Sequence, residues 1–510
     1  MLDIMSANVN VIAIALYLLL AFLLLAVLGF SLYAVLLAYV RWKYAHLPSP
    51  KTNSFFLGHA YELEQFKRRG NGENPPDEQY IQWAFEVGNV YVIFFHWRPF
   101  VVILNSAAIE AFNMSPLYKN STNRFEHLFG ARLVGNGLIS LQSYEVWKPR
   151  RQLYESAFNA SHLKGLIPNF CKRVDLFLKK LVPLADGETK VPLRKYMHDA
   201  AVDVISEVLF SSDFNTEWRG KPSTPRPGRE QELNFLLGEA FRGIQMSYLY
   251  PFFKFFHPFE AQHFREVAKT LRTIGSNCIE ARIKALDNSE SVPLDILSHI
   301  LRGATSDELA DIESLVDDFI MFYLGGVETT ANTLLFAVIQ VHQHADVLER
   351  LRAEIQEVLG DKDDITAEDL DKLKYTEQVI EETMRIPGII GGFMRECPAG
   401  GVTLSGYRIP SGTNMLFHTG AMCRMSQYIE DPYTFNPSRF DPANKRPSPY
   451  VYLPFGIGHH SCIAKHFAMM EAKLILSRLV QNFKVTFPDG YKLDLVERIS
   501  KPLQHTHISN

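Results

Sequence analysis

The distribution of hydrophobic and polar positions separates an apolar N-terminal segment from a long body with mixed patterning. Residues 11–40 carry no charged side chain, and Arg41 and Lys43 follow directly. About 20 apolar residues span a bilayer as a helix, so this run can cross one with tilt or overhang. A cleaved signal peptide is the competing interpretation, but it would have a basic start and a shorter apolar region. The sequence favours a membrane anchor over residues 1–44, with a transmembrane helix at about 11–40.

Helical periodicity dominates the body, residues 45–510, which we expect to form one domain. The run 77–88 has the spacing of an amphipathic helix, and helical periods dominate from 145 to about 383. Short runs rich in β-branched and aromatic residues predict strands in two hairpins, the first turning near Arg98 and Pro99. These strands are expected at residues 90–95, 100–104, 402–404 and 407–409. The predicted fold class is therefore mainly α with small β-sheets (α+β).

Composition and charge narrow the possible functions. The 510 residues carry a formal net charge of −4, which gives no reason to expect a nucleic-acid partner. The five cysteines are odd in number and widely spaced, which is not the pattern of a disulfide framework and favours a reducing compartment. They are Cys171, Cys278, Cys397, Cys423 and Cys462.

One of these cysteines has an unusual setting. Cys462 follows a loop that contains Gly456 and Gly458, and an apolar, helix-patterned run begins directly after it. A helix N-terminus stabilises a thiolate, and the glycines let the backbone approach a bulky flat partner closely. A lone cysteine is commonly an inert core residue. A zinc or iron–sulfur site would need more thiolates nearby. A catalytic nucleophile would need the ring of His459 or His460 to reach the sulfur. Axial thiolate ligation of haem needs one cysteine, a relieved backbone and a helix start, and all three are present.

The run from Phe455 to Ala464 resembles the cysteine loop of the cytochrome P450 family, the haem-thiolate monooxygenases. The resemblance implies the cytochrome P450 fold and heme b as cofactor, with the iron held by the Cys462 thiolate and with Phe455 and Gly458 among the cofactor-binding residues. The family usually has arginine at the position of His460 and glycine at that of Ala464. An imidazole offers a haem propionate at most one N–H and is only partly charged near neutrality.

A polar insert interrupts the long apolar helix pattern of residues 317–342. Two glycines, an acid and two hydroxyls cost stability there, about 1 kcal/mol per glycine. They are Gly325, Gly326, Glu328, Thr329 and Thr330, and the two glycines, Glu328 and Thr329 are the candidate catalytic residues. In one interpretation Thr329 bonds back to the Gly325 carbonyl and Glu328 finds a solvent edge. In the other, the insert opens a distorted groove beside the iron. It resembles the oxygen-activation helix of the family, which implies that these four residues form the catalytic group and that Thr329 and Glu328 deliver protons.

Glu382 and Arg385 stand three residues apart on one helix face and, taken alone, would be an ordinary surface pair. They resemble the Glu-x-x-Arg pair of the family, and the segment 435–440 resembles the one that supplies a third partner, Arg439. The resemblance implies a buried structural triad that supports the haem. Such charges persist only when they are fully hydrogen-bonded.

Three further residues resemble the family's propionate contacts. Trp147 and Arg151 lie four apart on a predicted helix, and Arg395 follows Arg385 by ten residues. A guanidinium matches a carboxylate bidentately, which makes arginine the expected residue at such a place. The alternative is that these are solvated helix charges.

Residues 128–140 carry a narrower resemblance, to the sterol side-chain hydroxylases of the family, in the loop that covers the substrate pocket. After Arg385, however, the glycine-rich run 386–392 replaces the usual Tyr-Pro-Pro turn, which should change the pocket shape. The aromatic run 248–259 is either core or a membrane-dipping substrate entrance.

The sequence thus predicts a membrane-bound haem-thiolate monooxygenase that hydroxylates a lipophilic substrate, a sterol, with O2. Electrons should come from NADPH through a separate cytochrome reductase, because no GxGxxG follows a predicted strand; Lys148, Lys465 and His466 could form its docking face. Arg41 and Lys43 after the span place the body on the cytoplasmic side, here of the endoplasmic reticulum, in a single-pass protein. The alternatives are a fatty-acid or xenobiotic hydroxylase of the same family, a haem-thiolate isomerase or dehydratase that does not use O2, and a non-catalytic lipid-binding protein.

Overall fold

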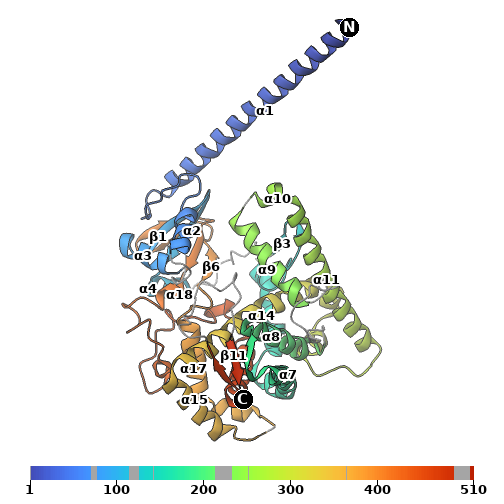
Figure 1. Ribbon diagram of the computed structural model, residues 1–510, viewed down its shortest axis with the longest axis vertical. Helices are drawn as coiled ribbons and strands as arrows, with labels where there is room; N and C mark the ends of the chain where they lie inside the picture. Colours follow the sequence, from blue (N-terminus) through green and yellow to red (C-terminus); the bar gives the residue numbers. More distant parts are fainter. Residues whose placement is uncertain are drawn as a thin grey trace.

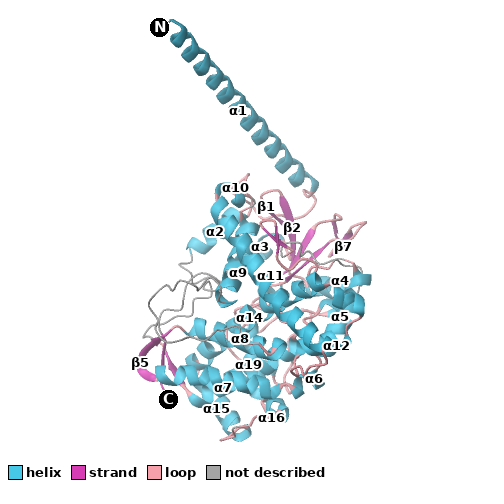
Figure 2. Cartoon of the chain, turned by 90° about the vertical axis from the view of Figure 1, so that its right-hand side faces the viewer, coloured by secondary structure: helices cyan, strands magenta, loops and turns pink. Residues whose placement is uncertain are grey.

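The computed structural model of the protein describes residues 2–69, 77–113, 126–141, 143–212, 233–250, 252–362, 364–487 and 506–509. One long N-terminal helix projects from a mostly helical body that also holds small β-sheets (Figure 1). Strands gather at the base of the projecting helix and, separately, near the C-terminus (Figure 2). The predicted fold class, mainly α with small sheets, is confirmed for these residues.

Helices form most of the body because long stretches of the chain place apolar residues three or four positions apart. In α7, for example, Phe170, Val174, Phe177 and Leu181 share one buried face. The α-helices are α1 (Leu2–Lys43), α2 (Ala60–Arg69), α3 (Asp77–Val87), α4 (Ser106–Asn113), α5 (Tyr144–Ala157), α6 (Ala160–Gly165), α7 (Ile167–Leu181), α8 (Leu193–Phe210), α9 (Leu233–Leu249), α10 (Phe253–Phe256), α11 (Pro258–Asp287), α12 (Ile296–Gly303), α13 (Ser306–Ala310), α14 (Ile312–Gln343), α15 (Ala345–Val358), α16 (Ala367–Lys372), α17 (Lys374–Arg385), α18 (Thr419–Met422) and α19 (Lys465–Asn482). Short 3-10 helices are η1 (Val182–Leu184), η3 (Pro437–Phe440) and η4 (Gly458–His460).

The main sheet has the strand order β1-β2-β9-β6, in which β2 and β9 are parallel and the other pairs antiparallel. The order β10-β11-β5 forms a second sheet, and β3-β4 and β7-β8 form two-stranded hairpins. The strands are β1 (Val90–Phe95), β2 (Arg98–Ile103), β3 (His127–Leu128), β4 (Ala131–Arg132), β5 (Asp186–Val191), β6 (Phe393–Glu396), β7 (Val402–Leu404), β8 (Tyr407–Ile409), β9 (Asn414–Phe417), β10 (Lys484–Thr486) and β11 (Thr506–Ser509). The predicted hairpin at 402–409 is confirmed.

The first predicted hairpin exists, but its turn was placed wrongly. The turn lies at His96 and Trp97, where His96 adopts a positive φ of 56°, and Arg98 already pairs with Phe95. Proline at position 99 is tolerated in the strand because pairing of β2 with β9 begins only at Phe100, so the missing N–H of Pro99 breaks no bond to β9. Pro99 therefore lies just before the residues of β2 that pair with β9, and it is not part of the turn.

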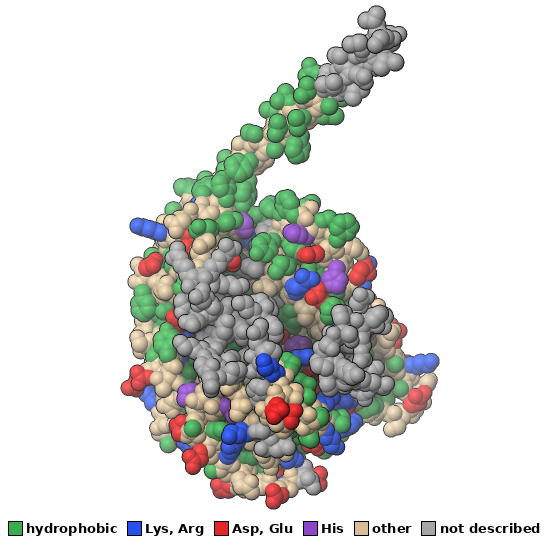
Figure 3. All heavy atoms as spheres, in the orientation of Figure 1, with side chains coloured by type: hydrophobic (Ala, Val, Ile, Leu, Met, Phe, Trp, Pro, Cys, Tyr) green, Lys and Arg blue, Asp and Glu red, His purple; other side chains and the backbone are tan. Residues whose placement is uncertain are grey.

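α14 runs through the centre of the helical core and packs against α8, α11, α17 and α19. It is apolar because it is surrounded by protein: its most apolar stretch is mostly buried in the body. The other described helix that is long and apolar enough to cross a membrane is α1, over Ile14–Lys43, and the most apolar stretch of that helix is not buried. Hydrophobic side chains cover this projecting helix in Figure 3.

The last turns of α1 pack onto the body without a break in the helix. Leu37 is buried, and Arg41 donates from Nη2 to the Phe55 carbonyl at 2.5 Å. Directly after the helix, the Tyr44 hydroxyl bonds Thr413 Oγ1 at 2.7 Å, beside the main sheet. The end of the apolar segment is therefore part of the packed body.

Candidate active site

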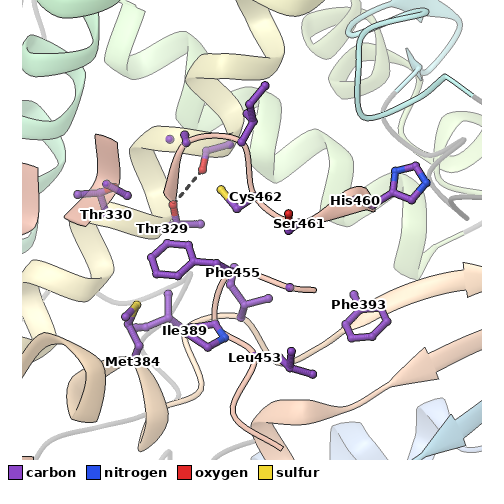
Figure 4. A pocket seen from close by; sticks show the side chains of 18 of the residues that line it. Thr329, Thr330, Met384, Ile389, Phe393, Leu453, Phe455, His460, Ser461 and Cys462 are labelled. Carbon is purple, nitrogen blue, oxygen red and sulfur yellow. Dashed lines mark hydrogen bonds between the residues drawn. The ribbon is translucent and has the colours of Figure 1, made fainter. Parts of the chain in front are cut away.

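A cavity of about 700 Å³ lies between α14 and the loop that precedes α19. Its wall is mostly apolar and takes residues from α5, α8, α14, α17, β6 and α19, as well as from segment 386–392. In Figure 4, Thr329 and Met384 lie at one end of the view and His460 and Phe393 at the other. Most of the predicted site residues meet here: Gly325, Gly326, Thr329, Cys462, Trp147, Arg151, Arg395, His460, Phe455 and Arg385 all line the cavity.

The loop before α19 folds back on itself and presents Cys462 to the cavity. Gly456 and Gly458 both adopt positive φ, 66° and 74°, and the Cys462 amide donates to the Phe455 carbonyl at 2.7 Å. These two glycines supply the left-handed conformations that side chains with a Cβ avoid. Gly458 shapes the loop without lining the cavity, whereas Gly456 is part of the wall.

Burial and the local polar groups act in opposite directions on the Cys462 thiol. α19 begins at Lys465, three residues beyond Cys462. The sulfur is open to the cavity but lies deep in the body, and this burial raises the pKa of the Cys462 thiol. The Ala464 amide and the charges of Arg151 and Lys465 lower that pKa, but they do not outweigh burial.

Side chains from α5, β6 and the cysteine loop form one polar corner of the cavity. Arg151 donates to the Ser461 carbonyl at 2.9 Å and pairs with Glu155, and the Trp147 ring lies 4.4 Å from that of His460. Burial, helped by the charges of Arg395 and Arg151, lowers the pKa of His460 to about 4. The imidazole is therefore neutral near pH 7, more completely than the sequence suggested.

Arg395 is the least compensated charge in this corner. Its Nη1 donates to the neighbouring Met394 carbonyl at 2.9 Å, and no carboxylate of the described residues pairs with it. Burial lowers the pKa of its guanidinium to about 10. A buried cation without a counter-charge is unfavourable, so this position suits a ligand that brings a negative group.

The polar insert of α14 behaves as the back-bonding interpretation expected. Thr329 Oγ1 donates to the Gly325 carbonyl at 2.9 Å, and this bond is drawn in Figure 4. α14 is a continuous α-helix across the insert, and Gly325, Gly326 and Thr329 line the cavity from it. The glycines have separate tasks: a Cβ on Gly326 would approach Ile205 to 2.7 Å, whereas a Cβ on Gly325 would meet nothing within 4 Å. Gly326 permits close packing on α8, and Gly325 leaves open space in the cavity wall.

Glu328 does not line the cavity, which corrects its placement beside Thr329 in one catalytic group. Its carboxylate accepts from Arg194 at 3.0 Å and faces His198 at 3.5 Å, both on α8. Burial works to raise the pKa of Glu328, but His198 and Arg194 outweigh it and lower the pKa. In this conformation the Glu328 carboxylate therefore points toward α8, whereas the Thr329 hydroxyl lies in the cavity wall.

The predicted structural triad is assembled. Glu382 and Arg385 are both fully buried, with Nε–Oε2 at 2.7 Å and Nη2–Oε1 at 2.8 Å, so this is not a surface pair. Arg439 reaches Glu382 Oε1 at 3.4 Å, and the amide of Asn436 donates to the same oxygen at 3.0 Å. Arg385 also donates to three backbone carbonyls, so every part of the pair is satisfied.

Sequence reasoning placed Thr330 in the polar insert without a role and missed Glu471, a polar residue behind this cavity. Thr330 lines it, and Glu471 of α19 is fully buried with no hydrogen-bond partner for either carboxyl oxygen among the described residues. The Thr330 hydroxyl is the polar side chain that acts to lower the Glu471 pKa, but burial raises that pKa well above its ordinary value. A carboxyl in the apolar face of the helix after Cys462 was the signal available in the sequence.

Comparison with known proteins agrees with this geometry. The family model of Cytochrome P450 matches residues 48–507. The chain is 30% identical over 419 residues to Cytochrome P450 3A6 of Oryctolagus cuniculus, covering 79% of this chain and 81% of the relative. It is 29% identical over 376 residues to Cytochrome P450 4d2 of Drosophila melanogaster, covering 69% and 72%. The chain belongs to the cytochrome P450 family. It is a monooxygenase of the oxidoreductase class, and its cofactor is a haem whose iron is held by a cysteine thiolate.

The residues around the cavity fit that cofactor. Cys462 is the described cysteine whose sulfur opens into the cavity from a glycine-relieved loop. The other cysteine in the wall, Cys423, is fully buried, and burial raises the pKa of its thiol to about 12. Haem propionates would supply the negative charge that Arg395 lacks.

Proposed function

We propose that this protein is a membrane-bound haem-thiolate monooxygenase in which Cys462 holds the iron and Thr329 takes part in proton delivery. One observation carries the proposal: the Cys462 sulfur and the hydroxyl-bearing insert of α14 open into the same apolar cavity from different elements. Arg395, Arg151, Trp147, His460 and Phe455 would hold the cofactor around its edge. The bound haem supplies the activation of O2, which no side chain of the chain can perform.

The protein side of the mechanism is binding, orientation and proton movement. The Thr329 hydroxyl donates a hydrogen bond to the Gly325 carbonyl, so its oxygen can accept a hydrogen bond from water or a protonated ligand in the cavity. Glu328, whose side chain is 26% exposed, lies one residue away between Arg194 and His198. Rotation of Glu328 out of these contacts would carry a proton from solvent toward Thr329. The apolar wall excludes bulk water from the rest of the site.

The decisive test is the reduced, carbon-monoxide-bound spectrum of the purified full-length protein. We expect the thiolate Soret band in the wild type and its loss in Cys462→Ser at equal protein concentration. Cys423→Ser is the matched control and should keep the band. Absence of the band in well-folded, haem-containing wild type would end the proposal.

The apolar cavity favours a lipophilic substrate. We propose a sterol, in the manner of cholesterol 24-hydroxylase, because Leu138 and Ile139 of the segment that resembles sterol side-chain hydroxylases contribute to the wall. The glycine-rich segment contributes Gly388 and Gly392 to the wall, where larger residues would reduce the space. The alternative is a fatty-acid or xenobiotic hydroxylase. A low-to-high-spin shift with cholesterol but not with lauric acid supports the sterol, and the reverse result supports the alternative.

We propose that residues 1–44 anchor the protein in the endoplasmic reticulum membrane, with residues 45–510 as the cytoplasmic catalytic domain. Exposed aromatic residues continue the apolar surface of α1: the Phe56 ring contacts Phe30, with centroids 4.8 Å apart. A second group on and beside α10 includes Phe256 and Phe259, the latter 90% exposed. Figure 3 shows hydrophobic side chains over this end of the body. This favours the membrane-contact interpretation of the aromatic run 248–259, of which residue 251 lies outside the described part.

The membrane proposal can be tested on the intact protein in microsomes. Alkaline carbonate should leave the wild type in the pellet, and protease added outside should digest the body. Protection of the body from protease would contradict the cytoplasmic placement. Phe256→Ser with Phe259→Ser should keep the anchor but weaken contact of the body, measured as increased protease cleavage near α10.

We propose NADPH–cytochrome reductase as the electron donor. Lys148, Lys465 and His466 are exposed close to Cys462 in the chain or on α5, where an acidic partner could approach the cofactor. Product formation should require both NADPH and the reductase. Turnover of an oxygenated lipid without either would instead favour the isomerase or dehydratase alternative. A well-folded protein that lacks haem would favour the lipid-binding alternative.

A further inference from the structure

Two adjacent aspartates of α14, Asp317 and Asp318, are fully buried in the body. They precede Thr329 on the same helix, and Asp317 lies about 18 Å from it along the axis. Two neighbouring carboxylates in a core helix are unfavourable unless each is fully hydrogen-bonded. They point in different directions from the helix, and their partners come from different elements.

Asp317 binds the segment that follows β3 and the helix α11. Arg132 of β4 forms a bidentate pair with it, Nε–Oδ1 at 3.0 Å and Nη2–Oδ2 at 2.5 Å. Arg272 of α11 donates to Oδ1 at 2.6 Å, and the backbone amide of Asn136 donates to Oδ2 at 2.8 Å. Both oxygens therefore have two partners, and three elements converge on one carboxylate.

Asp318 binds α5. Arg150 donates to its Oδ2 from Nε at 2.8 Å and also from Nη2, and the Tyr154 hydroxyl donates to the same oxygen at 2.6 Å. Its other oxygen, Oδ1, accepts from the Leu138 amide at 2.7 Å. The neighbour of Arg150 on α5 is Arg151, which lines the cavity and bonds the cysteine loop.

Glycines let the backbone of this segment reach both carboxylates. Gly135 has a positive φ of 38°, and a Cβ there would overlap the Asp317 carboxylate. A Cβ on Gly137 would come within 3.2 Å of Asp318 Oδ1. The chain then continues directly into Leu138 and Ile139, which enter the cavity wall; we call these two residues the roof.

We propose that the two aspartates divide the positioning of the active site between them. Asp317 fixes the segment that leads into the roof, at Asn136, against α11 and thereby sets how a bulky ligand fits the cavity. The charge of Asp318 fixes α5 through Arg150 and thereby holds the helix that presents Trp147 and Arg151 to the haem, whereas its bond to the Leu138 amide needs only a neutral acceptor. Both are positioning residues, and neither touches the cofactor or the substrate. The inference rests on the proposed haem site and goes beyond it by assigning separate determinants for ligand fit and for cofactor retention.

The test compares Asp317→Asn and Asp318→Asn in the full-length, haem-loaded protein. The first readout is the dissociation constant of two iron-ligating probes: imidazole, which is too small to reach the roof, and econazole, which is bulky and apolar. The second is the rate of haem transfer to apomyoglobin. Glu313→Gln is the matched control, because Glu313 also pairs with Arg272 but is 66% exposed and should be silent in both readouts.

We expect Asp317→Asn to raise the dissociation constant of econazole by about tenfold, or about 1.4 kcal/mol. The affinity for imidazole and the rate of haem loss should stay close to those of the wild type. Asp318→Asn should instead speed haem loss by about tenfold. Asn at 318 can still accept from the Leu138 amide, so the roof contact survives while the charge facing Arg150 is removed. Equal effects of both variants on both readouts, or an unchanged econazole-to-imidazole ratio in Asp317→Asn, would overturn the division of tasks.

A second variant covers the case in which Asp317→Asn does not fold. Gly135→Ala keeps every charge but pushes the backbone away from Asp317, so it should reproduce the selective loss of econazole affinity. If Gly135→Ala binds both probes as the wild type does, the role of Asp317 is refuted. Wild-type protein without the thiolate Soret band would refute the proposed function itself, so the two failures are distinguishable.

Discussion

Arg385 grips Glu382 with two hydrogen bonds while its remaining nitrogen donates to the carbonyls of Cys423 and Pro432, and no part of either side chain reaches solvent. Arginine is needed here because one planar group donates to a carboxylate and to three carbonyls at once. The pair ties α17 to the segment before η3, below the cavity, and so belongs to the support of the site.

We predict that Arg385→Lys loses most of the haem-loaded, folded protein although it keeps the charge. A lysine cannot make the bidentate contact, and breaking a buried pair costs about 3–5 kcal/mol. The measurement is haem per protein after purification, with the thermal unfolding midpoint beside it. Arg446→Lys, at a partly exposed pair with Glu381, is the control and should change neither. Normal haem content in Arg385→Lys would contradict the supporting role.

Thr329→Ala should separate electron consumption from product formation. The hydroxyl is the acceptor that we place in proton delivery, and such groups contribute about 10²-fold or more to rate. Product per NADPH should fall sharply while NADPH oxidation continues and the carbon-monoxide spectrum stays intact. Thr329→Ser should retain most of the coupling because it keeps the hydroxyl. An alanine variant with wild-type coupling would remove Thr329 from the mechanism.

Glu471→Gln should change how stability depends on pH. Burial raises the pKa of Glu471 well above its ordinary value, so above pH about 4.3 the folded protein holds a proton that the unfolded chain has lost. Wild-type stability therefore decreases as pH rises through this window, by up to about 1.4 kcal/mol per pH unit. Glutamine cannot ionise. The thermal unfolding midpoint of the variant minus that of the wild type should therefore increase between pH 5 and pH 8.

The comparison needs an acid whose removal leaves the core intact. Glu368→Gln, at an exposed position of α16, should give a midpoint difference that does not change with pH in the way expected for Glu471. A pH-independent difference for Glu471→Gln as well would mean that Glu471 titrates normally and that its burial has no energetic consequence.

His460→Arg should slow haem loss. The imidazole is neutral at the polar corner, whereas a guanidinium would add charge and donors for a propionate. The rate of haem transfer to apomyoglobin measures the effect, and His459→Arg, an exposed neighbour, is the control. Faster loss in His460→Arg than in His459→Arg would show that Arg395 and Arg151 already saturate the corner and repel a third charge.

Patterns that depend on neighbours along the chain were predicted well. The helix at 77–88, the hairpin around Ser405 and the long core helix α14 follow from local periodicity and turn residues, and each is present. The cysteine loop and the pair of Glu382 and Arg385 also lie within short segments. Their residue types and spacing were enough to bring them to one cavity or into one buried contact.

Relationships across long sequence separations were not predictable in the same way. The partners of Glu328 lie on α8, more than a hundred residues earlier, so spacing alone could not show that the acid turns away from the cavity. The same holds for Asp317 and Arg132, which are 185 positions apart. Burial is likewise a property of the assembled body, so the sequence around Cys462 could not show that burial would oppose the groups that lower the pKa of this thiol.

The unbroken passage of α1 from its exposed turns into its packed ones has a mechanical meaning. Leu37 is buried in the body and Tyr44 is hydrogen-bonded to Thr413, so no flexible linker separates the proposed anchor from the body at this point. The body cannot turn about the membrane normal unless the embedded helix turns with it. In the proposed membrane-bound state, the tilt of this single helix would therefore set the height at which a redox partner in the same bilayer meets the body.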